Sequence, residues 1–154
     1  MKTVVTKSAE ETEAFGQYLA PLLKPGDVIA FYGDLGAGKT TFVRGLARGM
    51  DSSEPVSSPT FVIMHIYEGR LPIYHFDAYR LTGAQDLWNI GADEYIDGDG
   101  VACIEWSERA EEVLPPQRLM ICMRRVAGDP QGRILEVTGI GQRGEELERE
   151  ISFG

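Results

Sequence analysis

The sequence predicts an α/β protein with three layers, in which helices cover a central, mostly parallel sheet with antiparallel additions. Strand-like and helix-like segments alternate in the first half of the chain, an order typical of parallel sheets. Residues 28–32 and 101–104 are short and almost wholly apolar, as expected of strands buried on both faces. Pairs of strand-like segments come later and favour the antiparallel additions. No linker composition interrupts the 154 residues, so we expect one domain over 1–154.

The N-terminal region contains the first strand and the first helix. Residues 3–6 alternate in the manner of a short strand. Ser8, with Glu11 three residues later, forms a capping box that begins a helix. The Pro25-Gly26 pair is expected to end this helix, and the first apolar strand follows.

The other expected elements follow from hydrophobic periodicity and turn residues. They are a helix over 39–50, a hairpin with strands over 61–67 and 71–76, a partly helical stretch over 82–97, the strand over 101–104, a short helix capped by Ser107, strands over 119–126 and 134–137 joined by a turn at 128–130, and a weakly helical tail over 145–151. A glycine-rich loop separates the first apolar strand from the helix over 39–50.

Composition and charge narrow the possible functions. The formal net charge is −9, with 24 acidic and 15 basic residues. Direct, tight nucleic-acid binding is not expected, because it needs a surplus of Lys and Arg. No apolar run approaches the ~20 residues of a membrane helix, and the N-terminus lacks the apolar core of a signal peptide. We therefore expect a cytoplasmic protein with no membrane partner, in which Cys103 and Cys122 are reduced and buried.

The glycine-rich loop carries the clearest chemical signal. The phosphate-binding pattern G-x-x-x-x-G-K-[ST] is matched in full by Gly33, Asp34, Leu35, Gly36, Ala37, Gly38, Lys39 and Thr40. In such a loop the glycines let backbone N–H groups turn toward phosphate oxygens, and the next helix presents its positive end to the same anion. Lys39 would reach the β- and γ-phosphates, and the Thr40 hydroxyl would bind Mg²⁺. A buried strand before the loop and an amphipathic helix after it are the context of a P-loop NTPase fold.

The base bound at this loop is expected to be adenine. A guanine-specific switch protein needs N-K-x-D, and the single Asn of the chain, Asn89, is followed by Ile90 and Gly91. We therefore expect the cofactors to be ATP and Mg²⁺.

Two carboxylates are candidates for the magnesium site, because each follows a strand expected near the loop. Glu105 follows the second apolar strand and is favoured as the Walker B residue, the carboxylate that holds the metal. Asp77 would hold a metal-bound water or position the attacking water; the alternative is a turn residue paired with Arg80. Thr60 could bind Mg²⁺ as the threonine of a switch segment does, or could belong to a turn that enters a strand.

Five segments occur in the order found in one family, and the ordered set is far more specific than any one segment. They are Gly33–Thr41, Ser58–Phe61, His75–Leu81, Gly91–Tyr95 and Ile104–Trp106. Over roughly residues 8 to 135 the chain resembles TsaE, the ATPase subunit of the bacterial machinery that installs threonylcarbamoyl on adenosine at position thirty-seven of tRNAs.

The resemblance implies a weak, Mg²⁺-dependent ATPase that binds the TsaB–TsaD pair and supports its turnover, without gripping tRNA itself. The metal-binding Thr and Glu of the family fall on Thr40 and Glu105, and the nucleotide-binding run extends to Thr41. The Asp of its H-F-D-x-Y-R motif falls on Asp77, so Asp77 and Glu105 would act in catalysis together with Lys39. A nucleotide-contacting Arg falls on Arg133, for which a solvated position after a turn is the alternative.

Two other functions stay open at this point. A small-molecule kinase would suit the fold and the size, but a kinase shields its phosphoryl group from water, usually with an Arg-bearing lid. No clear Arg-rich lid follows the loop. A pure binding module would hold ATP without turnover. Lys39, Thr40 and Glu105 argue only weakly against it, because binding alone also uses them.

Overall fold

The computed structural model describes residues 1–33, 38–56, 64–77, 93–96, 98–105, 107 and 114–153. In chain order its elements are β1 (Lys2–Thr6), α1 (Ala9–Leu19), a 3₁₀ turn η1 (Ala20–Leu22), β2 (Val28–Gly33), α2 (Lys39–Gly49), β3 (Met64–Tyr67), β4 (Ile73–Asp77), α4 (Asp93–Ile96), β5 (Val101–Glu105), β6 (Arg118–Val126), β7 (Asp129–Ile140) and α5 (Gly141–Glu150). The alternation expected for the first half of the chain is confirmed.

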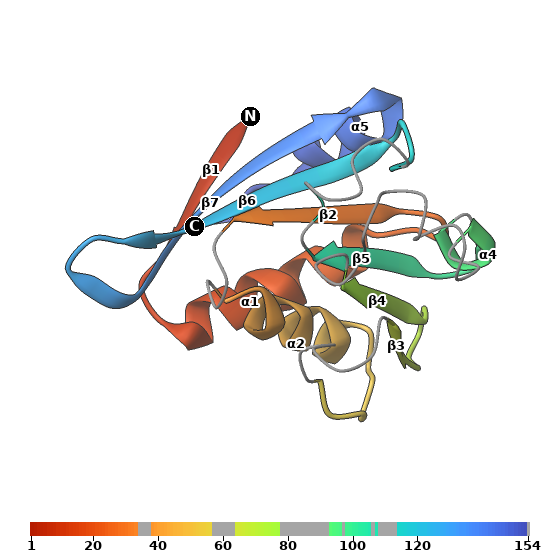
Figure 1. Ribbon diagram of the computed structural model, residues 1–154, viewed down its shortest axis with the longest axis horizontal. Coiled ribbons are helices and arrows are strands. Elements are labelled where there is room, and N and C mark those ends of the chain that lie inside the picture. The colour runs from red at the N-terminus through yellow and green to blue at the C-terminus, as the bar shows by residue number, and fades with distance from the viewer. Residues whose placement is uncertain are drawn as a thin grey trace.

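A seven-stranded mixed sheet organises the chain, in the order β1-β7-β6-β2-β5-β4-β3. Its central pairs, β6 with β2, β2 with β5 and β5 with β4, are parallel. Its outer pairs, β1 with β7, β7 with β6 and β4 with β3, are antiparallel. The prediction of a mostly parallel centre with antiparallel additions is therefore confirmed (Figure 1).

Helices α1, α2 and α5 cover one face of the sheet, and α4 lies on the other (Figure 1). In the larger core the Phe31 ring meets the Phe42 ring edge-on, with 5.3 Å between their centroids. The apolar residues of α2 and of its C-cap are buried, namely Phe42, Val43, Leu46, Ala47 and Met50. On the opposite face Ile96 and Leu114 pack in a smaller cluster.

Helix α1 begins as expected but ends early. The Ser8 hydroxyl accepts a hydrogen bond from the Glu11 N–H at 3.2 Å, while the Glu11 carboxylate accepts one from the Lys7 N–H at 3.3 Å. The helix does not reach the Pro25-Gly26 pair, because Pro21 lacks an N–H and its ring crowds the preceding turn. The chain tightens there into η1.

The β6–β7 hairpin differs from its expected bounds. Strand β7 is longer than the predicted segment 134–137, because it pairs with β1 on one side and with β6 on the other. Val126 pairs with Asp129, so the turn lies at 127–128 and not at 128–130. The hydrophobic pattern marked only the buried part of the strand.

Three expected elements fall partly outside the described residues. The structure shows 64–67 of the strand predicted over 61–67, and the helix α4 within the stretch predicted over 82–97. Of the helix predicted after Ser107 it describes Ser107 itself, whose hydroxyl donates to the Ile104 carbonyl at 2.8 Å. Among the residues that the structure describes, no helix is both long enough and apolar enough to cross a membrane.

The two cysteines are free thiols, but they differ in burial. Cys103 lies in the core, and burial raises the pKa of its thiol. Cys122 is only half-buried, which corrects the expectation of two core residues. Leu119 and Ile121 face the helical layer, and the period-two alternation of a strand turns Cys122 the other way.

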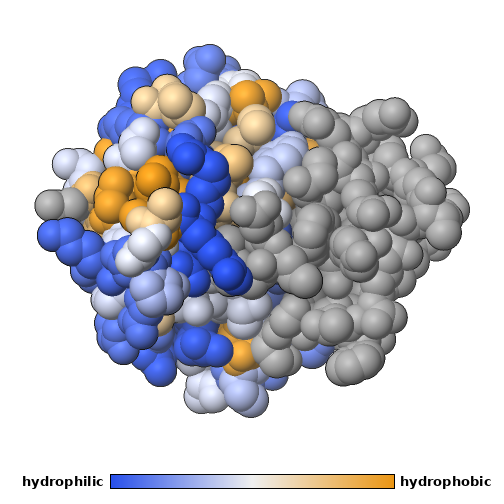
Figure 2. Space-filling model, turned by 60° about the vertical axis from the view of Figure 1, so that its left-hand side comes forward, coloured by the Kyte–Doolittle hydropathy of each residue, from blue (hydrophilic) through white to orange (hydrophobic). Residues whose placement is uncertain are grey.

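Among the described residues, few large apolar side chains are exposed. On the face in Figure 2, hydrophobic residues form a small patch surrounded by hydrophilic ones. Among the described residues the exposed large hydrophobic side chains are Met1, Val5 and Ile66, and the last two belong to the edge strands β1 and β3. Strand β1 has only five residues, which limits edge-to-edge pairing between molecules on that side of the sheet.

Candidate functional site

Three parallel strands place the predicted site residues at one edge of the sheet. Gly33, Asp77 and Glu105 are the last residues of β2, β4 and β5. Asp77 and Glu105 are register partners on neighbouring strands. Because ligands of open α/β sheets bind at the carboxyl ends of the strands, this edge is the expected place for a nucleotide.

The two ends of the phosphate loop need glycine for geometric reasons. Gly33 has a φ of +120°, and a Cβ there would stand 2.2 Å from the Met123 carbonyl oxygen. Gly38 caps α2 in a left-handed conformation with a φ of +103°. A side chain at either position would force the backbone to move, so both glycines shape the loop. Asp34, Leu35, Gly36 and Ala37 lie outside the described residues.

Lys39 is almost fully buried although it carries a charge. Its side chain lies in the first turn of α2 and is 4% exposed. Its Nζ donates a hydrogen bond to the Gly33 carbonyl at 3.1 Å, so it crosses the mouth of the loop. A buried ammonium is costly unless polar groups surround it. The position is therefore suited to an ammonium that binds an anion in the loop.

Glu105 is also buried, at 7% exposure, and has a specific partner. Its Oε2 is hydrogen-bonded to Nε2 of His75, which is fully buried. The Nδ1 of His75 is in turn hydrogen-bonded to the Tyr67 hydroxyl at 3.2 Å. In the sequence His75 was notable only as the first residue of the segment His75–Leu81, and the structure shows its two hydrogen bonds. That Glu105 is the partner of His75 follows only from the strand register. Asp77 is the register partner of Glu105, and His75, two residues before Asp77, lies on the same face of β4.

Arg133 lies beside the phosphate loop. A Cβ placed on Gly38 would be 3.4 Å from the Arg133 Nε. The Arg133 Nη1 donates to the carbonyls of Pro130 and Gly132 at 2.9 and 2.8 Å. The hairpin of β6 and β7 thus brings this guanidinium to the edge of the sheet that carries the loop, although Arg133 is far from the loop in sequence.

A cavity of about 210 Å³ opens between this hairpin and the loop. It is lined by Ala9, Thr12, Gly38, Thr41, Gln131 and Arg133. The Thr12 hydroxyl is hydrogen-bonded to the Thr6 hydroxyl at 2.6 Å, which fixes one wall. The sequence analysis missed Ala9, Thr12 and Gln131, because no local motif marks them.

Other expected ligands are only partly described. For Asp77 the backbone position at the end of β4 is known, and its side chain lies outside the described atoms. Thr60 and Trp106 also lie outside the described residues. Within the described part of the chain, no group of three or more His, Cys, Asp or Glu residues could hold a metal ion. Mg²⁺ prefers oxygen ligands, so carboxylate, hydroxyl, phosphate and water oxygens are the ligands expected of a magnesium site.

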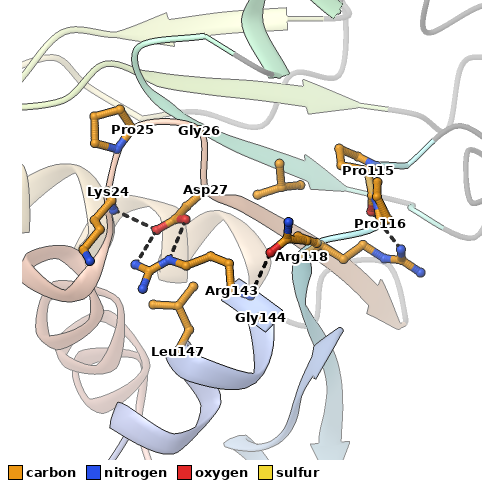
Figure 3. Close-up of a pocket in the computed structure, with 12 residues that line it drawn as sticks. Lys24, Pro25, Gly26, Asp27, Pro115, Pro116, Arg118, Arg143, Gly144 and Leu147 are labelled. Carbon is orange, nitrogen blue, oxygen red and sulfur yellow. Dashed lines mark hydrogen bonds and ion pairs between the residues drawn. The ribbon is translucent and has the colours of Figure 1, made fainter. Parts of the chain in front are cut away.

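A larger cavity, of about 380 Å³, lies at the opposite edge of the sheet. Figure 3 shows Pro115 and Pro116 on one side of it and Lys24 and Pro25 on the other, with Asp27 between them. It opens near the amino ends of β2 and β6, far from the loop and from Glu105. Its size does not make it the nucleotide site, because the residues suited to phosphate lie at the other edge.

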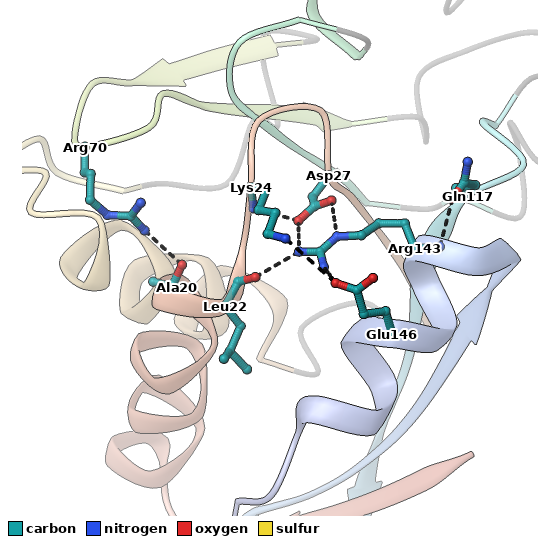
Figure 4. Close-up of polar contacts among 8 residues, drawn as sticks. All are labelled: Ala20, Leu22, Lys24, Asp27, Arg70, Gln117, Arg143 and Glu146. Atoms are coloured by element: carbon teal, nitrogen blue, oxygen red, sulfur yellow. Dashed lines mark hydrogen bonds and ion pairs between the residues drawn. The ribbon is translucent and has the colours of Figure 1, made fainter.

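A closed ion pair forms part of the wall of this larger cavity (Figure 4). The Arg143 Nε and Nη2 donate to the two Asp27 carboxylate oxygens at 2.9 and 2.8 Å. Nη2 also donates to the Leu22 carbonyl, and Nη1 donates to Glu146. The hydrogen bond to Asp27 is the main reason why the pKa of Arg143 is raised. These bonds hold the first turn of α5 against the connection between α1 and β2.

Comparison with known proteins identifies the family. A family model described as Threonylcarbamoyl adenosine biosynthesis protein TsaE matches residues 6–133. The tRNA threonylcarbamoyladenosine biosynthesis protein TsaE of Bacillus subtilis (strain 168) is 45% identical over 148 residues, which cover 96% of this chain and 91% of that protein. The protein of the same name from Treponema pallidum (strain Nichols) is 44% identical over 123 residues, covering 80% and 91%. A crystal structure of Bacillus subtilis YdiB matches with a TM-score of 0.83 and 41% identity, covering 97% of this chain and 92% of that one. This chain therefore belongs to the TsaE family.

Proposed function

We propose that this protein binds ATP with Mg²⁺ and hydrolyses the ATP slowly, as one component of the machinery that makes threonylcarbamoyladenosine in tRNA. One observation carries the proposal: the glycine-lined ends of the loop, the buried Lys39 and the Glu105 carboxylate lie at the same edge of the sheet. The pathway is supported by the names of the relatives. The assignment of a nucleotide as the ligand is supported by the chemistry of the loop.

The residues at this edge fit a chain of phosphates. Gly33 and Gly38 give the two ends of the loop their positive φ angles, and α2 presents its positive end at Gly38. In this proposal the N–H groups of the loop, including those of Asp34 to Ala37, bind the phosphate oxygens. Lys39 donates to the β- and γ-phosphates, where negative charge accumulates as the bond to the leaving group breaks.

The proposed metal ligands are Thr40 and Glu105, with Thr60 as a further one. Bound Mg²⁺ would supply positive charge beside the phosphate oxygens. Asp77 positions the attacking water, because its backbone lies in register with Glu105 on the neighbouring strand. Arg133 binds the nucleotide from the side of the hairpin, and the cavity next to it receives the part of ATP beyond the phosphates.

The partner in this proposal is the TsaB–TsaD pair, and the place of action is the cytoplasm. The net charge of −9 is unfavourable for direct, tight contact with tRNA, so a protein partner would bring this chain to the reaction. The whole chain, 1–154, would act as one domain.

Family membership does not favour the small-molecule kinase that the residues alone left open. A pure ATP-binding module differs from the proposed enzyme only in turnover. The two are therefore separated by an assay of hydrolysis.

The test is ATP hydrolysis by the purified protein, alone and with a TsaB–TsaD pair. We expect a low rate alone, a higher rate with the pair, and loss of activity in Lys39→Ala and Glu105→Ala. If ATP binds but is not hydrolysed in any mixture, the protein is a pure ATP-binding module and not an ATPase. A pair that neither binds the protein nor changes its rate would refute the proposed partnership.

A further inference from the structure

His75 holds the candidate metal carboxylate from inside the protein. The ring lies in the middle of β4, is fully buried, and bonds Glu105 across the parallel ladder to β5. None of the described residues donates a hydrogen bond to the other carboxylate oxygen, Oε1. The bond thus engages one oxygen and fixes the plane of the carboxyl group.

The tautomer of His75 follows from its two partners. An ionised carboxylate can only accept, so the His75 Nε2–H donates to Glu105 Oε2. In the neutral ring Nδ1 then accepts, and the Tyr67 hydroxyl can supply the proton. Tyr67 is 2% exposed, which protects this contact from exchange with water. The chain Tyr67–His75–Glu105 therefore reaches from β3 through β4 to the end of β5.

We propose that His75 is a positioning residue for Glu105, oriented by Tyr67, and that it presents Oε1 to the metal that accompanies the nucleotide. The inference rests on the proposed function, because it assigns Glu105 to Mg²⁺. Because Mg²⁺ prefers oxygen ligands, the imidazole acts through the carboxylate and does not touch the ion. Such outer hydrogen bonds orient metal ligands, and their loss typically weakens metal binding about 10- to 100-fold.

The experiment measures Mg²⁺ affinity separately from nucleotide affinity. A fluorescent ADP analogue is titrated into the full-length protein in EDTA and again at rising Mg²⁺, and Mn²⁺ binding to the ADP complex is followed by electron paramagnetic resonance. For His75→Leu we expect the Mg²⁺ concentration at half-effect to rise about tenfold or more. Affinity in EDTA should stay within about twofold, because the ring does not touch the nucleotide.

Two further variants separate orientation from mere packing. His75→Gln can place an amide N–H near the position of Nε2, so it should recover most of the Mg²⁺ affinity that His75→Leu loses. Tyr67→Phe keeps the ring and removes the hydroxyl, so a smaller rise in the Mg²⁺ requirement, about threefold, is expected. If His75→Leu does not fold, these two variants decide the question by themselves.

The matched control is Tyr74→Phe. It removes a hydroxyl from β4, the strand that carries His75; this hydroxyl donates to Asp99 at 2.6 Å on the opposite face. This variant should leave the Mg²⁺ requirement unchanged.

Glu105→Gln separates failure of the inference from failure of the proposed function. If this variant raises the Mg²⁺ requirement while His75→Leu and Tyr67→Phe do not, the positioning role is wrong and the metal site stands. If Glu105→Gln itself has no effect on Mg²⁺ or Mn²⁺ binding, both the assigned metal ligand and the inference fail.

Discussion

Both ends of the parallel strands bury charge, but they hold it in different ways. At the amino end Asp27 and Arg143 neutralise each other through two hydrogen bonds. At the carboxyl end Lys39 donates to the Gly33 carbonyl, and Glu105 is bonded to an imidazole. The Asp27–Arg143 ion pair connects two elements of the fold, whereas Lys39 and Glu105 lie beside a glycine-lined loop, where we expect a ligand to bind. We infer that burial alone does not identify a functional charge, and that its place in the fold must also be considered.

The largest effect that would test this contrast is on stability. Asp27→Ala removes the buried carboxylate of the pair and leaves Arg143 with the more exposed Glu146 as its acidic partner, so we expect a loss of about 3 kcal/mol in the free energy of unfolding, the low end for a broken buried ion pair. Urea denaturation measures it. Nucleotide affinity of the folded fraction should not change, because Asp27 lies at the opposite edge from the loop.

The control for this prediction is a double-mutant cycle with Arg143→Met. Removing the arginine from the Asp27→Ala protein should cost much less than removing it from the wild-type protein. Equal costs in the two backgrounds would mean that the pair is not coupled.

At the loop we expect the opposite outcome, a loss of activity without a loss of stability. Lys39→Met keeps the aliphatic stem and removes the charge, so we expect ATP hydrolysis to fall about 100-fold or more. The melting temperature should stay the same or rise, because a buried ammonium kept for a ligand costs stability. A large fall in melting temperature, measured by calorimetry, would show that Lys39 stabilises the fold, as Asp27 and Arg143 do.

Arg133 tests whether the hairpin belongs to the site. Arg133→Ala should weaken binding of an ADP analogue about tenfold, as loss of a charge-assisted hydrogen bond does. Fluorescence titration measures this, and Arg125→Ala on the neighbouring strand is the matched control, since the two residues are register partners. If the two variants weaken binding equally, the effect is one of general electrostatics and not of a specific contact. If neither variant weakens binding, Arg133 does not bind the nucleotide and is a solvated residue after a turn.

The smallest expected effect concerns pH. Glu148 accepts a hydrogen bond from the Gly139 N–H at 2.8 Å and another from the N-terminal ammonium, and these lower its pKa from the ordinary 4.5. A lowered carboxyl pKa contributes stability above pH 4.5 and loses it as the pH falls below that value through the folded pKa.

Glu148→Gln should therefore reduce stability at neutral pH by less than about 1 kcal/mol and flatten the loss on acidification. Urea denaturation at neutral pH and about one pH unit below 4.5 measures both quantities. Glu145→Gln, an exposed residue of the same helix, is the control. A wild-type stability that rises on acidification would contradict the assignment.

Much of the fold was predictable because its signals are local. The apolar segments 28–32 and 101–104 proved to be adjacent central strands, and the capping residue of α1 is the predicted Ser8. The phosphate loop was found from one contiguous pattern. Roles for Lys39, Thr40 and Glu105 stay predictions until ligand binding is measured.

Other features could not be read from neighbouring residues. Strand β7 takes its length from two partner strands, and α5 begins at Gly141, ahead of the predicted 145, where Arg143 closes on Asp27. The cavity beside Arg133 joins residues from three separate parts of the chain.

The sequence by itself determined the α/β class, the phosphate loop and the family, because each depends on the order of residues along the chain. The tertiary structure decided which buried charges pair with each other and which lie beside the loop. That distinction depends on distances between residues far apart in sequence, such as His75 to Glu105 and Asp27 to Arg143. Hydrophobic periodicity predicts elements, but the register of the strands and the packing of the helices set those distances.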